Sequence, residues 1–188
     1  EVASVLAFSA IRNNDRVGLL LFSDGVEKYV PPGKGRKHVL RVIRDILYFQ
    51  PESRKTNIDK SLRYLSHVAH RSAMIFLISD FLDSDYDRAM RITNQRYDLI
   101  PVMTVDDREM FLPNVGAVAL EDSETGQLVE VNTSDPEVRR RFAKAAQDRV
   151  DGIRKQCVRA GMDVVEIRSV RSYIESLHNF FKNRIRRR

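Results

Sequence analysis

The residues best suited to chemistry are oxygen donors that follow predicted strands. An apolar run at residues 74–78 ends before Asp80, and a second run at residues 99–105 ends before Asp106. In open α/β sheets, ligands bind beyond the carboxyl ends of the strands. Hydroxyl and carboxylate oxygens are suitable ligands for Mg²⁺. Thr56 and Asp80, contributed by separate loops, would therefore supply half of a cation site that water and other groups complete.

Most of these residues also have a simpler structural explanation. Thr56, followed by Asp59 three positions later, fits a capping box at a helix start. Residues 83–87 (DSDYD) hold three acids that favour the positive end of the next helix, which Ser84 could cap. Asp80 is harder to explain in this way, because it stands at the end of the strand before the helix begins.

Other candidate motifs are weaker. Residues 33–37 (GKGRK) have the composition of a phosphate loop but not its spacing. His67 and His70 are three residues apart on a predicted helix, without the glutamate of a zinc-protease motif. Cys157 falls on the apolar side of its helix, which indicates a small core residue rather than a nucleophile. The sequence contains no serine nucleophile elbow, paired-cysteine zinc site or dinucleotide fingerprint, so we expect a protein that is not an enzyme.

The elements that position these residues follow from the hydrophobic pattern. Apolar strands are predicted at residues 15–22, 26–30, 74–78, 99–105 and 163–167, with a break at the prolines of 31–33. Amphipathic helices are predicted at residues 36–49, 57–69, 84–94, 136–160 and from the Ser172–Glu175 capping box onward. A hairpin joins residues 115–120 to 128–131. Alternating strands and helices predict an open α/β fold with a mainly parallel sheet and small appended hairpins.

The length, composition and charge of the chain limit the class of protein and its possible partners. The chain has 188 residues, 43% of them hydrophobic and 31% charged, which is typical of one globular domain over residues 1–188. No apolar run is long enough to span a membrane. The net charge is +6, and residues 182–188 (KNRIRRR) carry +5 of it, so the rest is nearly neutral. We interpret residues 182–188 as a solvated basic tail, with RNA or anionic lipid binding as the alternative.

The beginning of the chain also carries a signal. Residues 1–15 start in the middle of a helical pattern, without a cap in front and without the layout of a signal peptide. A single cysteine excludes an internal disulfide framework and favours a reducing compartment. We therefore expect a cytoplasmic fragment whose natural start lies upstream, with a membrane anchor in the parent protein left open.

Four segments in one order carry a family resemblance. They are DRVGLLLFSDGVEKYVPPGKGRKHVLRVIRDIL, KTNIDKSLRYL, MIFLISDFLD and YDLIPVMTVDDREMFLPNVGAVALEDSETGQ. The chain resembles the bacterial von Willebrand factor A-like family called domain of unknown function 58, which is associated with MoxR-type AAA+ ATPases. The resemblance implies a Rossmann-like, mostly parallel sheet with helices on both faces and a metal-ion-dependent adhesion site on its carboxyl edge.

The resemblance also implies ligands and a function. Carried over by motif, the site's threonine corresponds to Thr56 and its aspartate to Asp80, with Ser79, Asp83 and Asp106 at the rim. The family's D-x-S-x-S motif is absent, so what remains cannot enclose Mg²⁺ or Mn²⁺ without the missing part. The strand that carries this motif would also be missing, so the fragment should be unstable or recruit a replacement strand.

The expected function is that of a non-enzymatic protein-interaction module. Its partner would be a MoxR-type AAA+ ATPase or the client of such an ATPase, in the assembly or maturation of a protein complex. Two alternatives remain open at the level of the sequence. One is a Mg²⁺-dependent phosphotransfer or hydrolytic enzyme that uses Asp80, and the other is nucleic-acid or anionic-lipid binding through residues 182–188.

Overall fold

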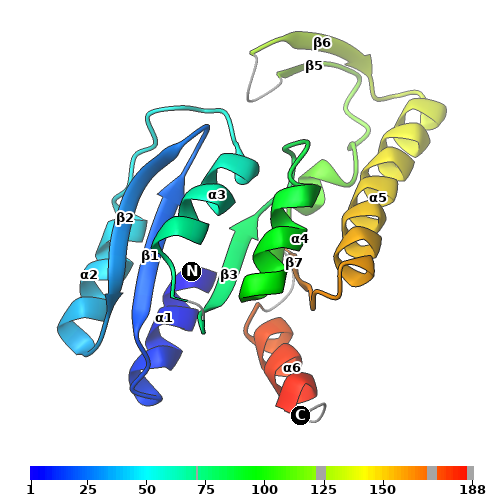
Figure 1. Cartoon of the computed structure of the whole chain (residues 1–188). Coiled ribbons are helices and arrows are strands. Elements are labelled where there is room, and N and C mark those ends of the chain that lie inside the picture. Colours follow the sequence, from blue (N-terminus) through cyan, green and yellow to red (C-terminus); the bar gives the residue numbers. More distant parts are fainter. Residues whose placement is uncertain (71, 122–125, 169–172, 186–188) are drawn as a thin grey trace. The chain divides into compact units, whose positions relative to one another are not determined.

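The computed structural model describes residues 1–70, 72–121, 126–168 and 173–185 (Figure 1). These residues form two compact units that alternate along the chain. The first unit comprises residues 1–73 and 82–96, and the second comprises residues 74–81 and 97–188. The predicted site residues are therefore divided between these two units.

The first unit combines a two-stranded antiparallel sheet with helices. Its elements are α1 (Val2–Arg12), β1 (Val17–Phe22), β2 (Val26–Gly33), α2 (Arg36–Leu47), α3 (Ile58–Val68) and α4 (Asp87–Arg96). β1 and β2 pair through the predicted tight turn, with Leu20 opposite Tyr29. A small core joins α1 to α2, where Ala7, Val39 and Ile43 are buried. The neighbouring positions of α1 and α2 can be followed in Figure 1.

Two predictions about this sheet were wrong. Pro31 and Pro32 were expected to end the second strand, but β2 continues through them to Gly33. In the described sheet β2 pairs only with β1, and proline is tolerated on such an edge strand because no ladder hydrogen bond is required from its nitrogen. The apolar run at residues 15–22 predicted a buried strand, yet the residues of β1 are only partly buried and Gly18 is exposed. A sheet of two strands offers too little cover to bury a strand fully.

The second unit contains a three-stranded parallel sheet in the order β3-β4-β7. Its elements are β3 (Met74–Ser79), β4 (Asp98–Val105), the 3₁₀ helix η1 (Asp107–Glu109), β5 (Ala117–Glu121), β6 (Leu128–Asn132), α5 (Pro136–Arg159), β7 (Val165–Arg168) and α6 (Tyr173–Ile185). The predicted mixed α/β class and parallel sheet are confirmed for this unit. The central strand β4 is the most buried, as its unbroken apolar run predicts.

The helix α5 covers the core of the second unit with one apolar stripe. Its buried residues are Ala146, Val150, Ile153 and Cys157, spaced by four, three and four positions. Cys157 is thus the small core residue that its position predicted. The helix begins after Asp135, whose carboxylate accepts a hydrogen bond from the Glu137 amide at 2.8 Å. No helix among the described residues combines the length and apolar character that crossing a bilayer requires.

The predicted hairpin forms between β5 and β6. Val118 lies opposite Val131, and Leu120 lies opposite Val129, so these four side chains share one face. The base of the hairpin is fixed by the fully buried Thr133. Its hydroxyl donates to the Gly116 carbonyl at 2.7 Å and accepts from the Val115 amide at 3.0 Å. The predicted turn at residues 122–125 and the predicted cap at Ser172 lie outside the described residues.

The carboxyl edge of the three-stranded sheet

The carboxyl ends of β3, β4 and β7 point in the same direction because the three strands are parallel. Ser79, the last residue of β3, pairs in register with Met103, and Asp80 follows directly. Asp106 follows the end of β4, and Arg168 closes β7 opposite Val105. One edge of one sheet therefore presents two carboxylates and one guanidinium, as the positions of the acids in the sequence predicted.

The turn after β3 exposes Asp80. The Ser79 hydroxyl accepts a hydrogen bond from the Phe81 amide at 3.1 Å, which closes the turn. Phe81 is buried and has a φ of 58°, a left-handed conformation that is uncommon for a bulky residue. This turn directs the Phe81 ring into the protein, while the Asp80 side chain is exposed. Ser79 therefore has a structural role in the turn, and its place at the rim of a site stays a prediction.

Asp106 is also exposed, but its carboxylate has a local task. It accepts a hydrogen bond from the Arg108 amide at 2.9 Å and so caps η1. Its neighbour Asp107 lies 3.7 Å from the Arg168 guanidinium. The charges at the β7 end of the edge are thus partly matched, whereas the β3 end carries the exposed carboxylate of Asp80.

A charged network continues from this edge along β7. Glu166 receives hydrogen bonds from Arg168, at 2.7 Å, and from Arg154 of α5. Burial is the largest single influence and raises the pKa of Glu166, but the hydrogen bonds and charges of Arg168 and Arg154 outweigh it, so the pKa lies below its ordinary value. Arg154 also pairs with Asp151 at 2.8 Å. Sequence reasoning missed this network, because no local pattern links Arg154 to a strand residue twelve positions later.

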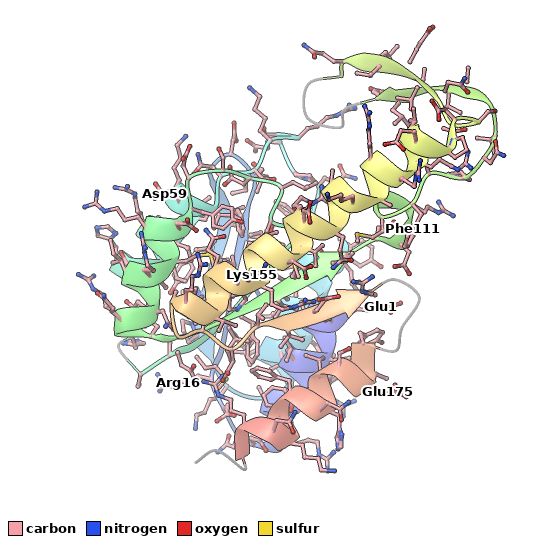
Figure 2. All side chains as sticks on the ribbon, turned by 90° about the vertical axis from the view of Figure 1, so that its right-hand side faces the viewer. Glu1, Arg16, Asp59, Phe111, Lys155 and Glu175 are labelled. Carbon is pink, nitrogen blue, oxygen red and sulfur yellow. The ribbon has the colours of Figure 1, made fainter. Side chains whose placement is uncertain are left out.

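Thr56 and Asp83 belong to the first unit, where they lie at the start of α3. The prediction that Thr56 caps this helix was wrong, because Asn57 is the cap and accepts from the Lys60 amide at 2.8 Å. Thr56 itself is partly buried one residue earlier. Asp59, labelled in Figure 2, occupies the first turn and pairs with Arg63.

Asp83 was expected to favour the start of its own following helix, and this was also wrong. One carboxylate oxygen accepts from the amide of Ile58, the first residue of α3, at 2.7 Å. The other oxygen accepts from the Ser84 amide at 2.7 Å. Ile58 is fully buried, so Asp83 satisfies a helix amide that solvent does not reach. Asp83 therefore stabilises a helix that begins 25 residues earlier in the chain.

These positions limit the metal chemistry of the described residues. Thr56 lies in one unit and Asp80 in the other, so their pairing in one site stays a prediction. Both oxygens of Asp83 and one oxygen of Asp106 are engaged by backbone amides. Within the described ranges, no group of three or more histidine, cysteine, aspartate or glutamate side chains is placed to hold a metal ion.

The remaining candidates have structural explanations where the structure describes them. His67 and His70 are exposed, and the His67 ring contacts the Arg63 carbonyl. In the basic tail, Lys182 and Arg184 belong to α6, and Arg184 forms ion pairs with Asp98 and Asp163. Arg184 is therefore not a free tail cation, and residues 186–188 lie outside the described part.

The fold and this edge define an α/β protein with a parallel sheet whose carboxyl end carries exposed acids. The chain belongs to the family described as "Protein of unknown function DUF58", whose model matches residues 1–151. It is 26% identical over 187 residues to two uncharacterized mycobacterial proteins, Mb1516 of Mycobacterium bovis and Rv1480 of Mycobacterium tuberculosis. The match covers 98% of this chain but 59% of each relative. The uncharacterized protein MAV169 of Mycobacterium avium is 28% identical over 160 residues, which are 84% of this chain and 94% of that protein.

Two solved structures are similar in fold. One is the conserved hypothetical protein BatB from Bacteroides thetaiotaomicron, with a TM-score of 0.53 and 10% identity over 97% of this chain and 83% of that one. The other is an aerotolerance-related membrane protein from Bacteroides fragilis, with a TM-score of 0.53 and 12% identity over 94% and 84% of the two chains. At such identities the likeness extends to the fold alone.

Proposed function

We propose that this chain is a von Willebrand factor A-like, Rossmann-type protein-interaction module of a bacterial cytoplasmic protein, and that it is not an enzyme. Its binding surface is the carboxyl edge of the β3-β4-β7 sheet. The observation that carries the proposal is the exposed Asp80 directly after β3, beside a second acid after the parallel strand β4. Carboxyl edges of parallel sheets are the usual ligand sites of α/β proteins.

The local contacts support a binding role for Asp80. The nearby acids have structural tasks, since Asp83 satisfies the Ile58 amide and Asp106 caps η1. Asp80 stands on a tight turn that Ser79 closes and the buried Phe81 anchors, and its carboxylate accepts a hydrogen bond from the Ser79 hydroxyl at 3.5 Å. A turn held from both sides presents its carboxylate in a fixed position, which lowers the entropy lost when a partner binds.

The partner in this proposal is a MoxR-type AAA+ ATPase or a client that such an ATPase remodels. The Mg²⁺ or Mn²⁺ dependence that the family resemblance implies belongs to the same proposal, with Thr56 and Asp80 as the ligands that this chain contributes. In this proposal water and further groups complete the coordination of the ion. The whole protein's activity is also a proposal, because the chain spans 59% of the length of Mb1516 and Rv1480.

A binding assay tests the proposal directly. The chain is immobilised and titrated with a purified MoxR-type ATPase from the same bacterium, in Mg²⁺ and in a chelator. We expect Asp80→Ala to weaken binding at least thirtyfold, since loss of a charged interface contact costs about 2–5 kcal/mol. Asp148→Ala, which removes an exposed acid from α5, is the matched control and should change binding less than twofold.

Two results would contradict the proposal. If the Asp80→Ala variant binds the ATPase with the affinity of the wild type, the sheet edge is not part of the interface. The second result is hydrolysis of a phosphate ester by the wild-type chain that is lost in Asp80→Ala but not in Asp148→Ala. This result would indicate that the chain is an enzyme rather than an interaction module.

A further inference from the structure

The helix α2 carries cations where they do not stabilise it. Its first two residues are Arg36 and Lys37, and its first turn contains no acid. Its N-cap is Gly35, without a side-chain hydrogen bond to the exposed amides. The N-terminus of a helix is the positive end of its macrodipole, so cations there oppose helix formation. The placement of Arg36 and Lys37 is therefore not explained by the stability of α2.

The same helix exposes large apolar side chains on its outer face. Val39, Val42 and Ile43 are buried on the inner face. Leu40 is 43% exposed and Leu47 is 63% exposed. Because these two leucines are seven positions apart, they lie on the same side of the helix, within about 20° of each other. The outer face of α2 thus carries an apolar stripe rather than polar residues alone.

Cations flank this stripe. Helical spacing places Arg36 on one side of the leucines and Lys37, Arg41 and Arg44 on the other. All four cations are exposed, and Tyr48, immediately after the helix, is 80% exposed. The outer face is defined by these four cations with Leu40, Leu47 and Tyr48.

One acid balances part of this charge. Asp45 lies 3.0 Å from both Arg44 and Lys28, and 3.8 Å from Arg41. The hydrogen bonds from Arg44 and Lys28 hold the pKa of Asp45 below its ordinary value, so it stays ionised at neutral pH. Arg36 and Lys37 have no acidic partner among the described ion pairs. With four cations against one acid in α2, the outer face keeps a positive charge.

We propose that the outer face of α2 docks on an anionic phospholipid bilayer, as a second binding surface apart from the sheet edge. A convex helix face with a leucine stripe, an interfacial tyrosine and flanking cations has the composition of helices that lie in the plane of a membrane surface. The leucines enter the acyl boundary, the cations meet lipid phosphates, and Tyr48 lies at the level of the headgroups.

A bilayer fits this face better than other polyanions do. Single-stranded nucleic acid is held by aromatic side chains that stack on bases, and this face carries one tyrosine and no other aromatic residue. Burial of Leu40 and Leu47 contributes nothing to binding a phosphate backbone, but it contributes directly to membrane binding. An acidic protein would need a matching apolar groove for the same helix, whereas a lipid surface adapts to it.

Charge variants test the electrostatic part of the proposal with the full chain. The probes are vesicles of phosphatidylcholine alone and vesicles that contain phosphatidylglycerol in equal amount, separated by flotation. We expect binding to the anionic vesicles only. Each cation near the surface changes the partition coefficient about fivefold, so the double variant Arg36→Gln/Lys37→Gln should bind roughly twenty-five-fold less. The matched control is Lys144→Gln/Lys155→Gln, two exposed lysines of α5, of which Lys155 is labelled in Figure 2.

A fluorescence experiment tests insertion. The chain contains no tryptophan, so Leu47→Trp introduces a single reporter on the outer face. Its emission should shift to the blue with anionic vesicles and be quenched by brominated lipid. Val158→Trp, at a position of α5 that is 64% exposed, is the control and should not respond.

Both the electrostatic test and the insertion test have outcomes that would contradict the proposal. The proposal is overturned if the chain does not bind anionic vesicles, or if the two double variants lose binding equally, which would indicate net charge alone. It is also overturned if the emission of the Leu47→Trp variant does not shift while that variant binds, or if heparin or RNA binds and vesicles do not. Since Asp80 is unchanged in all these variants, their ATPase binding tests the sheet edge independently.

Discussion

The contact between Asp83 and α3 leads to a quantitative prediction. The Asp83 carboxylate accepts a hydrogen bond from the Ile58 amide at 2.7 Å, and Ile58 is fully buried. A hydrogen bond to a charged group contributes about 1.5–3 kcal/mol, and an acid at a helix N-terminus adds about 0.3–1 kcal/mol. Because Asp83 is itself partly exposed, we expect Asp83→Ala to lower the free energy of unfolding by about 2 kcal/mol.

Denaturant titration followed by circular dichroism measures this loss, and amide exchange at Ile58 locates it. Asp83→Asn keeps an acceptor oxygen and loses the charge, so it should cost about 1 kcal/mol. Asp148→Ala removes an exposed acid and should stay within about 0.5 kcal/mol of wild type. If Asp83→Ala costs no more than Asp148→Ala, or if exchange at Ile58 is unchanged, Asp83 does not hold the start of α3.

Four further substitutions test other contacts. Glu166 has a lowered pKa in the folded protein, so its ionised form contributes stability above the ordinary carboxyl pKa of 4.5, and this stability is lost as the pH falls through the folded pKa. Glu166→Gln removes this contribution, so the free energy of unfolding of the variant should depend less on pH in acid. Thr133→Val should cost about 1–3 kcal/mol and speed amide exchange in the β5–β6 hairpin, because the hydrogen bonds of the fully buried hydroxyl to the Val115 amide and the Gly116 carbonyl are lost. Gly33→Ala should cost about 1–3 kcal/mol in denaturant titration, since a Cβ there would lie 2.6 Å from the His38 ring. Lys37→Glu should instead raise the free energy of unfolding by about 0.5–1 kcal/mol, because it places an acid in the first turn of α2.

The elements that could be predicted from the sequence are those fixed by local patterns. The unbroken apolar run of β4 predicted a buried strand, and the buried residues of α5 keep the helical spacing seen in the sequence. The end of α5 was also predictable, since Gly161 has a φ of 69° that favours glycine. These features depend on residues a few positions apart, so a single sequence contains them.

The predictions that failed depended on tertiary context. Whether Pro31 and Pro32 end a strand depends on how many partners β2 has, which its own residues do not record. Thr56 and Asn57 are both competent helix caps, and only the geometry of the loop selects Asn57. The amide that Asp83 accepts from lies 25 residues away, so its role could not be found from spacing.

Asp80 and Asp83 show how the candidate site and the fold can be separated. Both acids follow the same strand, but the sequence favoured a helix start for Asp83 and a metal site for Asp80. Asp83 is used by the fold, because its oxygens satisfy the amides of Ile58 and Ser84. Asp80 follows the end of β3 at the sheet edge, as its place in the sequence predicted, and its side chain is exposed.

The same reasoning applies to the cations of α2. A charged residue that satisfies a buried amide needs no further explanation, and its removal should lower stability. A charged residue that opposes its own helix, as Lys37 does, should raise stability when it is replaced by an acid. Functional residues often carry such a stability cost. A gain in stability together with a loss of vesicle binding in Lys37→Glu would therefore separate a binding role from a structural one, which neither measurement does alone.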